Sequence, residues 1–411
     1  MVIELSRVVI VGASTAGRSA AVALRDGGYA GEVLLVGEEP HPPYDRPQLS
    51  KQYLSGDAAL DDVIKPLRLT PEHGVEARLG TRALRVLPEE RAVELQGGER
   101  VGYDRLLLAT GVRNRRLPVP GAGLEGVLDL RDLAASERIR AAVRPGCRVV
   151  VVGMGFIGCE VAASLRRLGA EVTAVEPLAV PLERSLGEVV GRVVEGLHRD
   201  HGVDLRLGEG VIGFEGCGRV ERVLTRSGGH IDCDLVVVGV GVEPAVETVA
   251  GTAVRLDDGV VVDEGCRTSV PDVFAAGDVA RHHHPVAGRR IRVEHWQSAI
   301  GQGRVAARNM LGHAVVHDEI PWFWSDQYDC NLQYAGFAGP WDELAVRGSL
   351  ERRTFVGFYL RERRVVAAVA INQGRDLRRS VPLIRAGTPV DPVRLADPEV
   401  DLRTLVQPPA G

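Results

Sequence analysis

The apolar residues of this chain gather in short runs, and the first of them predict a strand–helix–strand unit. Residues 7–11 form an apolar run rich in β-branched residues, residues 16–24 are small and apolar, and residues 32–39 (EVLLVGEE) form a second run that ends in acid. This order predicts a strand, a turn, a helix packed on a sheet and a second strand. The chain therefore opens with a βαβ unit.

The same pattern returns at residues 147–177, CRVVVVGMGFIGCEVAASLRRLGAEVTAVEP. A run of valines leads into a turn that carries Gly153, Gly155 and Gly158, and then into a small-residue helix and a strand. In such a turn the first glycine allows the tight bend, the second lets the backbone approach a pyrophosphate, and the third lets the helix pack on the strand. The helix N-terminus favours the bound anion. Two such units in one chain predict two dinucleotides.

Glu176 ends the second strand of this later unit. A carboxylate there can accept hydrogen bonds from ribose hydroxyls and repels a 2′-phosphate, which favours NADH over NADPH. Arg184 is close enough in sequence to leave the choice open. The residues predicted to bind the pyridine nucleotide are Gly153, Gly155, Ile157, Gly158, Glu176, Arg184 and Gly241.

The first turn, VVIVGASTAGRS, differs from the second because Ser14 stands where the middle glycine is expected, between Gly12 and Gly17. Serine is tolerated there if its φ stays negative, and its hydroxyl can donate to a phosphate oxygen. The turn is therefore predicted to bind a nucleotide despite the substitution.

The rest of the chain reads mainly as strands until the C-terminal region. We expect a loop entering a helix at 42–56, a meander at 77–98, a buried strand at 103–111, antiparallel strands at 204–241, a strand at 269–280 and a helix at 294–311. From residue 321 the sequence becomes aromatic-rich, and 353–371 predicts a β-hairpin. We expect an FAD-binding domain at 1–118 plus 246–320, an NAD-binding domain at 119–245 and a C-terminal α+β domain at 321–411.

Composition narrows the class of protein. The net charge of −5 argues against a nucleic-acid binder. No run of about 18 apolar residues is free of charge, so no membrane span is expected, and the N-terminus has no secretory pattern. The six cysteines form no C-x-x-C pair, which favours reduced thiols in a cytoplasmic protein. Residues 345–385 hold ten arginines and three acids, either a solvated face or a docking surface for an acidic partner.

Several stretches together give the chain a family resemblance that covers nearly its whole length. PYDRPQLSK, GFIGCEVAASLRRLGAEVT, FAAGDVA, VEHWQSA and PWFWSDQYD resemble the bacterial FAD-dependent NAD(P)H:ferredoxin reductases of cytochrome P450 and aromatic-ring dioxygenase systems. The resemblance implies an α/β flavoprotein with two dinucleotide-binding domains, like glutathione reductase, and a C-terminal α+β domain. It implies FAD contacts at Gly12, Ser14, Ala16, Gly17, Glu38, Arg46, Lys51, Ala83, Thr110, Gly111, Arg131, Gly277, Asp278 and Trp296.

The resemblance also implies the reaction. Hydride would pass from NADH to FAD, and electrons would leave singly to a [2Fe–2S] ferredoxin near Trp324 and the arginine-rich C-terminal domain. Lys51 is one of only two lysines in the chain. The resemblance implies that it pairs with the helix glutamate, here Glu160, and that the pair stabilises negative charge on the reduced flavin. The chain is expected to be a monomer or a homodimer.

Other functions stay open at this point. A disulfide reductase or NADH oxidase needs a cysteine beside the flavin, and residues 8–146 contain none. A flavoprotein like apoptosis-inducing factor, which acts through partners, would share the fold. His282, His283 and His284 are consecutive and are not expected to converge on one metal ion.

Overall fold

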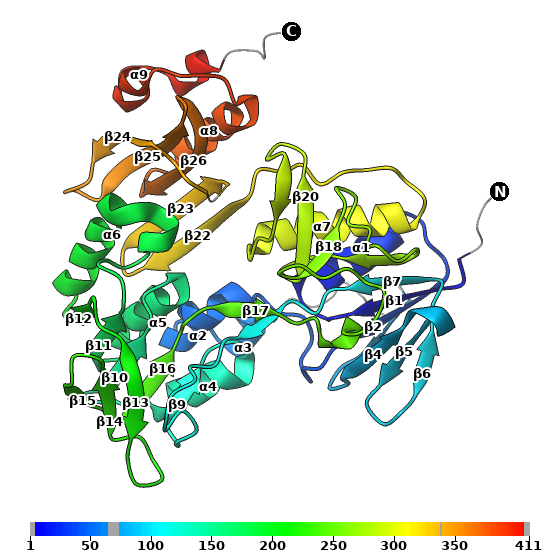
Figure 1. Ribbon diagram of the computed structural model, residues 1–411, viewed down its shortest axis with the longest axis horizontal. Coiled ribbons are helices and arrows are strands. Elements are labelled where there is room, and N and C mark those ends of the chain that lie inside the picture. Colours follow the sequence, from blue (N-terminus) through cyan, green and yellow to red (C-terminus); the bar gives the residue numbers. More distant parts are fainter. Residues whose placement is uncertain (1–4, 65–73, 338, 407–411) are drawn as a thin grey trace. The chain divides into compact units, whose positions relative to one another are not determined.

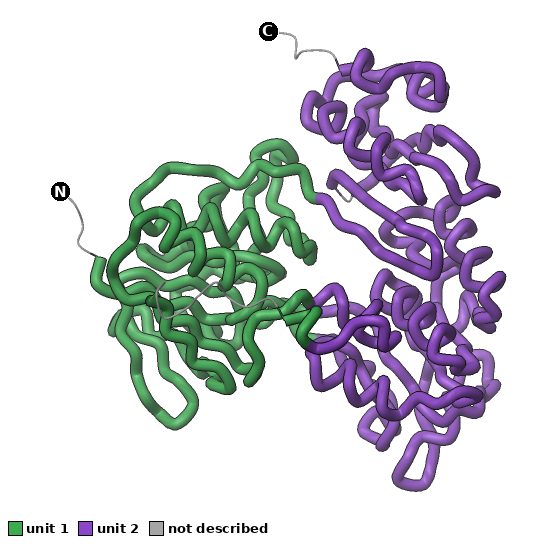
Figure 2. Tube along the Cα trace, turned by 180° about the vertical axis from the view of Figure 1, so that it is seen from behind, with its two compact units in different colours: residues 1–45, 61–113, 243–321 green, residues 46–60, 114–242, 322–411 purple. Residues whose placement is uncertain are grey.

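The structure is a computed structural model that describes residues 5–64, 74–337 and 339–406 (Figure 1). These residues form two compact units (Figure 2). Unit 1 takes the described parts of residues 1–45, 61–113 and 243–321, and unit 2 those of 46–60, 114–242 and 322–411. The stretch 46–60 thus groups with the second βαβ unit and the C-terminal region. The three-domain division stays a prediction.

Unit 1 is built on a five-stranded parallel sheet. In spatial order its strands are β19 (Val273–Ala275), β7 (Arg105–Leu108), β1 (Arg7–Val11), β2 (Glu32–Val36) and β3 (Val75–Arg78). Helices α1 (Thr15–Asp26) and α7 (Trp296–Met310) pack on each other. Their approach is close, since a Cβ on Gly303 would lie 2.4 Å from the carbonyl oxygen of Ala16. The helices predicted at 16–24 and 294–311 are thus present.

Two small sheets complete unit 1. The predicted meander is confirmed as the antiparallel sheet β4 (Ala83–Leu87), β5 (Ala92–Leu95) and β6 (Arg100–Gly102). A second three-stranded sheet contains β18 (Val260–Val262), β20 (Ala280–His284) and β21 (Arg289–Ile291).

Unit 2 contains a second five-stranded parallel sheet. Its strands are β12 (Asp204–Leu207), β11 (Glu171–Glu176), β10 (Arg148–Val152), β16 (Leu235–Val238) and β9 (Val127–Asp129), with α5 (Phe156–Arg167) and α6 (Glu183–Asp200) in the same unit. The prediction of antiparallel strands throughout 204–241 is wrong at both ends, because β12 and β16 join this parallel sheet. The run LVVV in β16 is buried over most of its length and lacks the alternation of a half-exposed strand. Only the middle of the stretch is antiparallel: β13 (Val211–Glu215), β14 (Arg222–Thr225) and β15 (His230–Asp232).

The C-terminal region of unit 2 is a five-stranded antiparallel sheet with helix α8 (Gly374–Ala386) against it. Its strands are, in order, β22 (Trp322–Gln327), β23 (Cys330–Gly336), β26 (Arg364–Ile371), β25 (Thr354–Arg361) and β24 (Glu343–Ser349). The predicted hairpin is confirmed by the pairing of β25 with β26. One hydrophobic core joins this sheet to α6 and to β10, and the hydroxyl of Tyr359 donates to the carbonyl of Leu186 in α6 at 2.7 Å.

The remaining elements are short connections and caps. They are η1 (Arg46–Ser50), α2 (Gln52–Ser55), α3 (Leu60–Val63), η3 (Pro88–Glu90), β8 (Val112–Asn114), α4 (Leu133–Ala142), β17 (Val242–Pro244), η4 (Glu247–Val249), α9 (Pro392–Ala396) and η5 (Leu402–Leu405). Among the described residues, no helix combines the length and apolar composition that crossing a membrane requires.

Candidate active site

The turn after β1 has the close packing of a dinucleotide-binding turn. Gly12 has a φ of +116°, and a Cβ there would lie 2.1 Å from the carbonyl oxygen of Ala109. A Cβ on Gly17 would lie 1.9 Å from the carbonyl oxygen of Gly12. Only glycine fits at these two positions, so the first and third glycines of the turn are required by the backbone itself.

Ser14 takes the middle position of this turn without strain. Its φ is −98° and its ψ is −159°, and Gly155 at the matching position of the second turn has −72° and −174°. Both lie in the extended region that any residue adopts, so the condition for tolerating serine is met. The Ser14 hydroxyl makes no capping bond to α1, which has no acid in its first turn. The hydroxyl is therefore not used to cap the helix, and the N-terminus of α1 favours an anion in the turn.

The loops after β7 and β19 end at the same edge of the sheet as this turn. The three strands are in register up to Val11, Leu108 and Ala275. A Cβ on Gly277 would lie 3.0 Å from the Cβ of Ala16, so the loop after β19 lies against α1. Unit 1 thus brings together one set of predicted FAD residues: Gly12, Ser14, Ala16, Gly17, Thr110, Gly111, Gly277 and Asp278.

The second turn repeats this geometry in unit 2. Gly153 has a φ of +93° and a Cβ on it would lie 2.5 Å from the carbonyl oxygen of Gly239. A Cβ on Gly158 would lie 2.0 Å from the carbonyl oxygen of Gly153. By contrast, a Cβ on Gly155 would meet no atom within 4 Å, and α5 has no acid in its first turn. The open space lies where the backbone of such a turn approaches a pyrophosphate.

Glu176 is fixed beside the second turn. It is buried at the end of β11, and its two carboxylate oxygens accept from the backbone N–H groups of Met154 at 2.7 Å and Leu178 at 3.0 Å. Three other residues predicted for this nucleotide are in the same unit: Ile157, half exposed on α5, Arg184, exposed on α6, and Gly241, with a φ of +98°.

Lys51 and Glu160 form a buried ion pair within unit 2. The Lys51 Nζ lies 3.1 Å from Glu160 Oε1 and donates to the carbonyl of Pro47 at 3.3 Å. Both side chains are less than a tenth exposed. Glu160 also accepts from the hydroxyls of Ser50 and of Ser325, the latter at 2.7 Å. The structure thus contains the expected pair of Lys51 and Glu160. Its role toward a flavin stays a prediction.

Trp324 contacts this pair from β22. The Lys51 Nζ lies 5.6 Å from the centre of the Trp324 ring, within cation–π range. Trp322 stacks on Trp324 with ring centres 5.5 Å apart, whereas Phe323 points to the other face of the strand and meets Phe156 of α5 at 4.7 Å. The aromatic residues of this strand therefore lie on two faces: Phe323 packs against α5, and Trp324 lies beside Lys51.

The other predicted FAD contacts are spread over both units. In unit 2 an Arg46 Nη donates to the carbonyl of Arg131 at 2.5 Å. In unit 1, Glu38 is exposed 3.6 Å from Arg82, Ala83 begins β4 and Trp296 begins α7. Their contacts with a cofactor stay predictions.

Sequence reasoning missed the polar residues behind the ion pair. These are Ser50, Ser325, Gln327 and His198, all buried. One signal was available for two of them, because alternation along WFWSDQ places Ser325 and Gln327 on one face of the strand.

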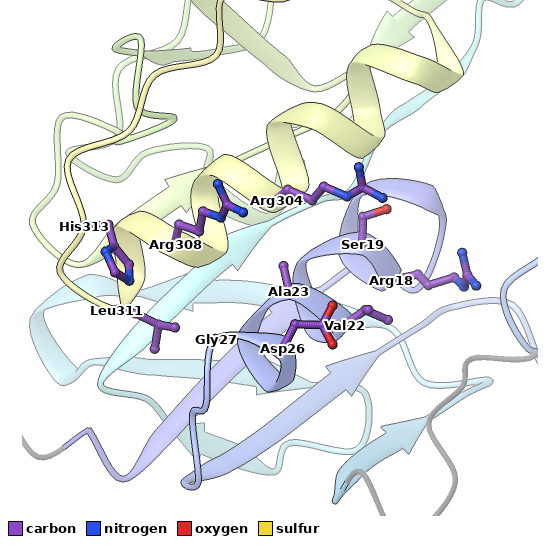
Figure 3. A pocket seen from close by; sticks show the side chains of 10 residues that line it. All are labelled: Arg18, Ser19, Val22, Ala23, Asp26, Gly27, Arg304, Arg308, Leu311 and His313. Carbon is purple, nitrogen blue, oxygen red and sulfur yellow. The ribbon is translucent and has the colours of Figure 1, made fainter.

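A groove of about 470 Å³ lies along α1 and α7 in unit 1 (Figure 3). Arg18, Arg304, Arg308 and His313 give it a basic lining against a single acid, Asp26. None of the predicted FAD contacts lines it, so this groove is distinct from the phosphate-binding turn.

Burial fixes the protonation state of several cysteines and histidines near pH 7. All six thiols are free, and burial raises the pKa of Cys159 and Cys266, which keeps both protonated and unreactive. Burial lowers the pKa of His282 to about 4 and of His317 to about 3, so both are neutral at pH 7. Across the described part of the chain, no group of three or more His, Cys, Asp or Glu is arranged to hold a metal ion.

Two parallel sheets, each with a glycine turn at its carboxyl edge, and a buried lysine–glutamate pair define a two-dinucleotide oxidoreductase. The chain belongs to the pyridine nucleotide-disulphide oxidoreductase family, whose model matches residues 6–303, and a reductase C-terminal model matches residues 322–406. The predicted family and fold class are confirmed.

The chain is similar to several named reductases. The chain is 38% identical over 401 residues to rhodocoxin reductase of Rhodococcus erythropolis, covering 97% of this chain and 94% of that protein. It is 40% identical over 401 residues to the ferredoxin–NAD(+) reductase component of the anthranilate 1,2-dioxygenase system of Burkholderia cepacia, covering 97% and 98%. The reductase in the covalent putidaredoxin reductase–putidaredoxin complex superposes with a TM-score of 0.94, at 35% identity, covering 98% of each chain.

FAD and NADH are the cofactors of this class, and the residues present fit both. At each turn the first and third glycines leave no room for a Cβ, while the middle residue is extended and the helix behind it begins without acid. This is a cradle for a pyrophosphate. The buried Glu176 adds a hydrogen-bond acceptor at the second turn.

Proposed function

We propose that this chain is an FAD-dependent NADH:ferredoxin reductase that delivers electrons to a [2Fe–2S] ferredoxin serving a cytochrome P450 or an aromatic-ring dioxygenase. The observation that carries the proposal is the buried Lys51–Glu160 pair beside Trp324, in a chain whose relatives are reductases of such systems. The thiols count against a disulfide reductase, because none is paired and burial keeps Cys159, the one next to Glu160, protonated. We also propose a cytoplasmic location, in keeping with free thiols.

Each part of the chain has a defined task in this proposal. Bound FAD supplies the redox chemistry, because it accepts a hydride from NADH and releases electrons one at a time. The turn at Gly12 holds the FAD pyrophosphate and the turn at Gly153 holds that of NADH. Lys51 places a compact positive charge where negative charge builds on reduction, and Glu160 holds that ammonium in position.

We place the ferredoxin site around Trp324 and the first turns of α8. Trp324 pairs in register with Gln333, and a Cβ on Gly374 at the start of α8 would lie 2.6 Å from the Gln333 side chain. The exposed Arg375 and Arg378 follow directly on this helix. A positive surface beside an aromatic residue suits an acidic electron carrier. The arginine-rich segment is not one uniform face, because Arg347 is buried and donates to backbone carbonyls near residue 398.

Reversing charge at this site is expected to weaken ferredoxin reduction alone. In R375E/R378E the KM for a [2Fe–2S] ferredoxin should rise about tenfold, because steering and docking lose two positive charges. Reduction of ferricyanide, a small acceptor that needs no docking surface, should not change. R222E/R226E makes the same change of charge at two exposed arginines, Arg222 on β14 and Arg226 directly after it, and is the control. Ferredoxin-dependent cytochrome c reduction by the wild type should also weaken with added salt. An unchanged KM for R375E/R378E, or salt-insensitive coupling, would remove this docking site.

Glu176 is expected to set the preference for NADH over NADPH. In Glu176→Gln the ratio of kcat/KM for NADH to that for NADPH should fall about tenfold, about 1.4 kcal/mol, since the amide no longer repels a 2′-phosphate. Glu171→Gln, an exposed acid at the start of the same strand, is the control. A wild type that uses NADPH better than NADH would contradict this assignment.

A further inference from the structure

A chain of hydrogen bonds between side chains runs from Glu160 to His198 on α6 and on to Tyr328. Ser325 lies 2.7 Å from Glu160 Oε1, Gln327 Nε2 lies 3.1 Å from the Ser325 oxygen, and Gln327 Oε1 lies 3.1 Å from His198 Nε2. The other ring nitrogen of His198 lies 3.1 Å from the Tyr328 hydroxyl. Every member belongs to unit 2, and Ser325, Gln327 and His198 are each at most 2% exposed.

The donor and acceptor chemistry gives this chain a direction. A carboxylate only accepts, so Ser325 donates its proton to Glu160 and its oxygen accepts from the Gln327 amide N–H. The Gln327 oxygen then faces His198, whose Nε2 must carry the proton. In that tautomer Nδ1 accepts, and the Tyr328 hydroxyl donates to it. Every hydrogen in the chain points toward Glu160.

The ionisation states agree with this direction. Burial lowers the pKa of His198 to about 4, so the ring is neutral near pH 7 and can carry one proton and accept another. Burial raises the pKa of Tyr328, which keeps the phenol as a donor. Aligned hydrogen bonds in a site of low dielectric polarise one another and strengthen the last one, here the bond to Glu160.

The hydrogen bonds end at Glu160 Oε1, the same oxygen that pairs with Lys51. Ser325 and Lys51 share Glu160 Oε1, while Ser50 takes Oε2. We propose that Ser325, Gln327 and His198 are positioning residues that fix the Glu160 carboxylate and, through it, the ammonium of Lys51. The inference rests on the proposed function, because Lys51 acts there on the flavin.

The strand β22 is the source of this arrangement. Its alternation sends Ser325 and Gln327 inward to α5 and α6, while Trp324 on the other side lies over Lys51. The strand β22 thus contacts Lys51 directly through Trp324, and it donates a hydrogen bond to the partner of Lys51, Glu160, through Ser325. The rival explanation is that the chain only joins the C-terminal sheet to α5 and α6.

The test uses the FAD-loaded enzyme and two matched serines. Ser325→Ala and Gln327→Met interrupt the chain of hydrogen bonds, whereas Ser325→Thr keeps the hydroxyl. The control is Ser380→Ala, which removes an equally buried hydroxyl that donates to Leu377 in α8. Three quantities are measured: the midpoint potential of the bound flavin, the limiting rate of its anaerobic reduction by NADH with the NADH concentration at half-maximal rate, and the melting temperature.

We expect Ser325→Ala and Gln327→Met to shift the flavin potential and to lower the limiting rate about tenfold, the effect of one hydrogen bond to a charged group. NADH saturation should not change, Ser325→Thr should restore both values, and Ser380→Ala should match the wild type. If Ser325→Ala and Gln327→Met lower only the melting temperature, the hydrogen bonds have a purely structural role and the inference is wrong. Failure of the wild type itself to be reduced by NADH would instead reject the proposed function.

Discussion

Replacing Lys51 with methionine is expected to slow reduction of the bound flavin by NADH about 100-fold, the usual cost of removing one preorganised charge or donor from a reacting centre. Methionine has nearly the same length and fills the same buried space, so NADH affinity should change by less than about twofold, because uniform binding is untouched. Stopped-flow absorbance of the flavin under anaerobic conditions separates the limiting rate from NADH saturation.

The stability of this variant needs its own control, because Lys51→Met leaves the buried Glu160 without its cation. Breaking a buried ion pair on one side costs about 3 kcal/mol or more of the free energy of unfolding. The double variant K51M/E160Q removes both charges and should recover much of that stability without recovering the rate. A wild-type rate of reduction in Lys51→Met would reject the role assigned to the pair.

A methyl group on Gly17 is expected to abolish FAD binding. Its Cβ would lie 1.9 Å from the carbonyl oxygen of Gly12, so α1 must move away from β1 and take its N-terminus out of the turn. Flavin content of purified Gly17→Ala should fall below about a tenth of the wild-type value, which from a nearly saturated site takes a loss of about 100-fold in affinity, about 2.7 kcal/mol. Absorbance of the released flavin measures this directly.

Gly158→Ala is the matched control for this variant, since its Cβ would lie 2.0 Å from the carbonyl oxygen of Gly153 in the second turn. It should keep its flavin and lose NADH-dependent reduction, while dithionite still reduces the flavin. Loss of flavin from Gly158→Ala, or its full retention in Gly17→Ala, would contradict the assignment of one nucleotide to each turn.

Local patterns predicted much of the fold. Both βαβ units follow from apolar runs that end in glycine turns, and the tolerance of Ser14 follows from the requirement for a negative φ, which the structure meets at −98°. Glu176 was found because the end of the strand after a glycine turn is a fixed place in such a unit. The residues that carry these signals lie close together in the sequence, so the signals can be recognised without knowledge of the tertiary structure.

The remaining features depend on contacts between distant segments. The run at 204–241 mixes strands of two sheets, and only pairing with β10 and β11 makes β12 and β16 parallel. Arg347 looked like a surface charge but is buried against backbone carbonyls some 50 residues away. The hydrogen bond between Gln327 and His198 joins residues 129 positions apart, and no local pattern reveals such a contact.

The central claim is that NADH reduces the flavin of this chain and that the electrons leave singly to a [2Fe–2S] ferredoxin. Anaerobic titration of the FAD-loaded enzyme with NADH in the presence of excess ferredoxin measures this most directly. The account predicts two ferredoxins reduced for each NADH, with the flavin oxidised again at the end. A flavin that NADH does not reduce, or one that is reduced while the ferredoxin stays oxidised, would contradict it.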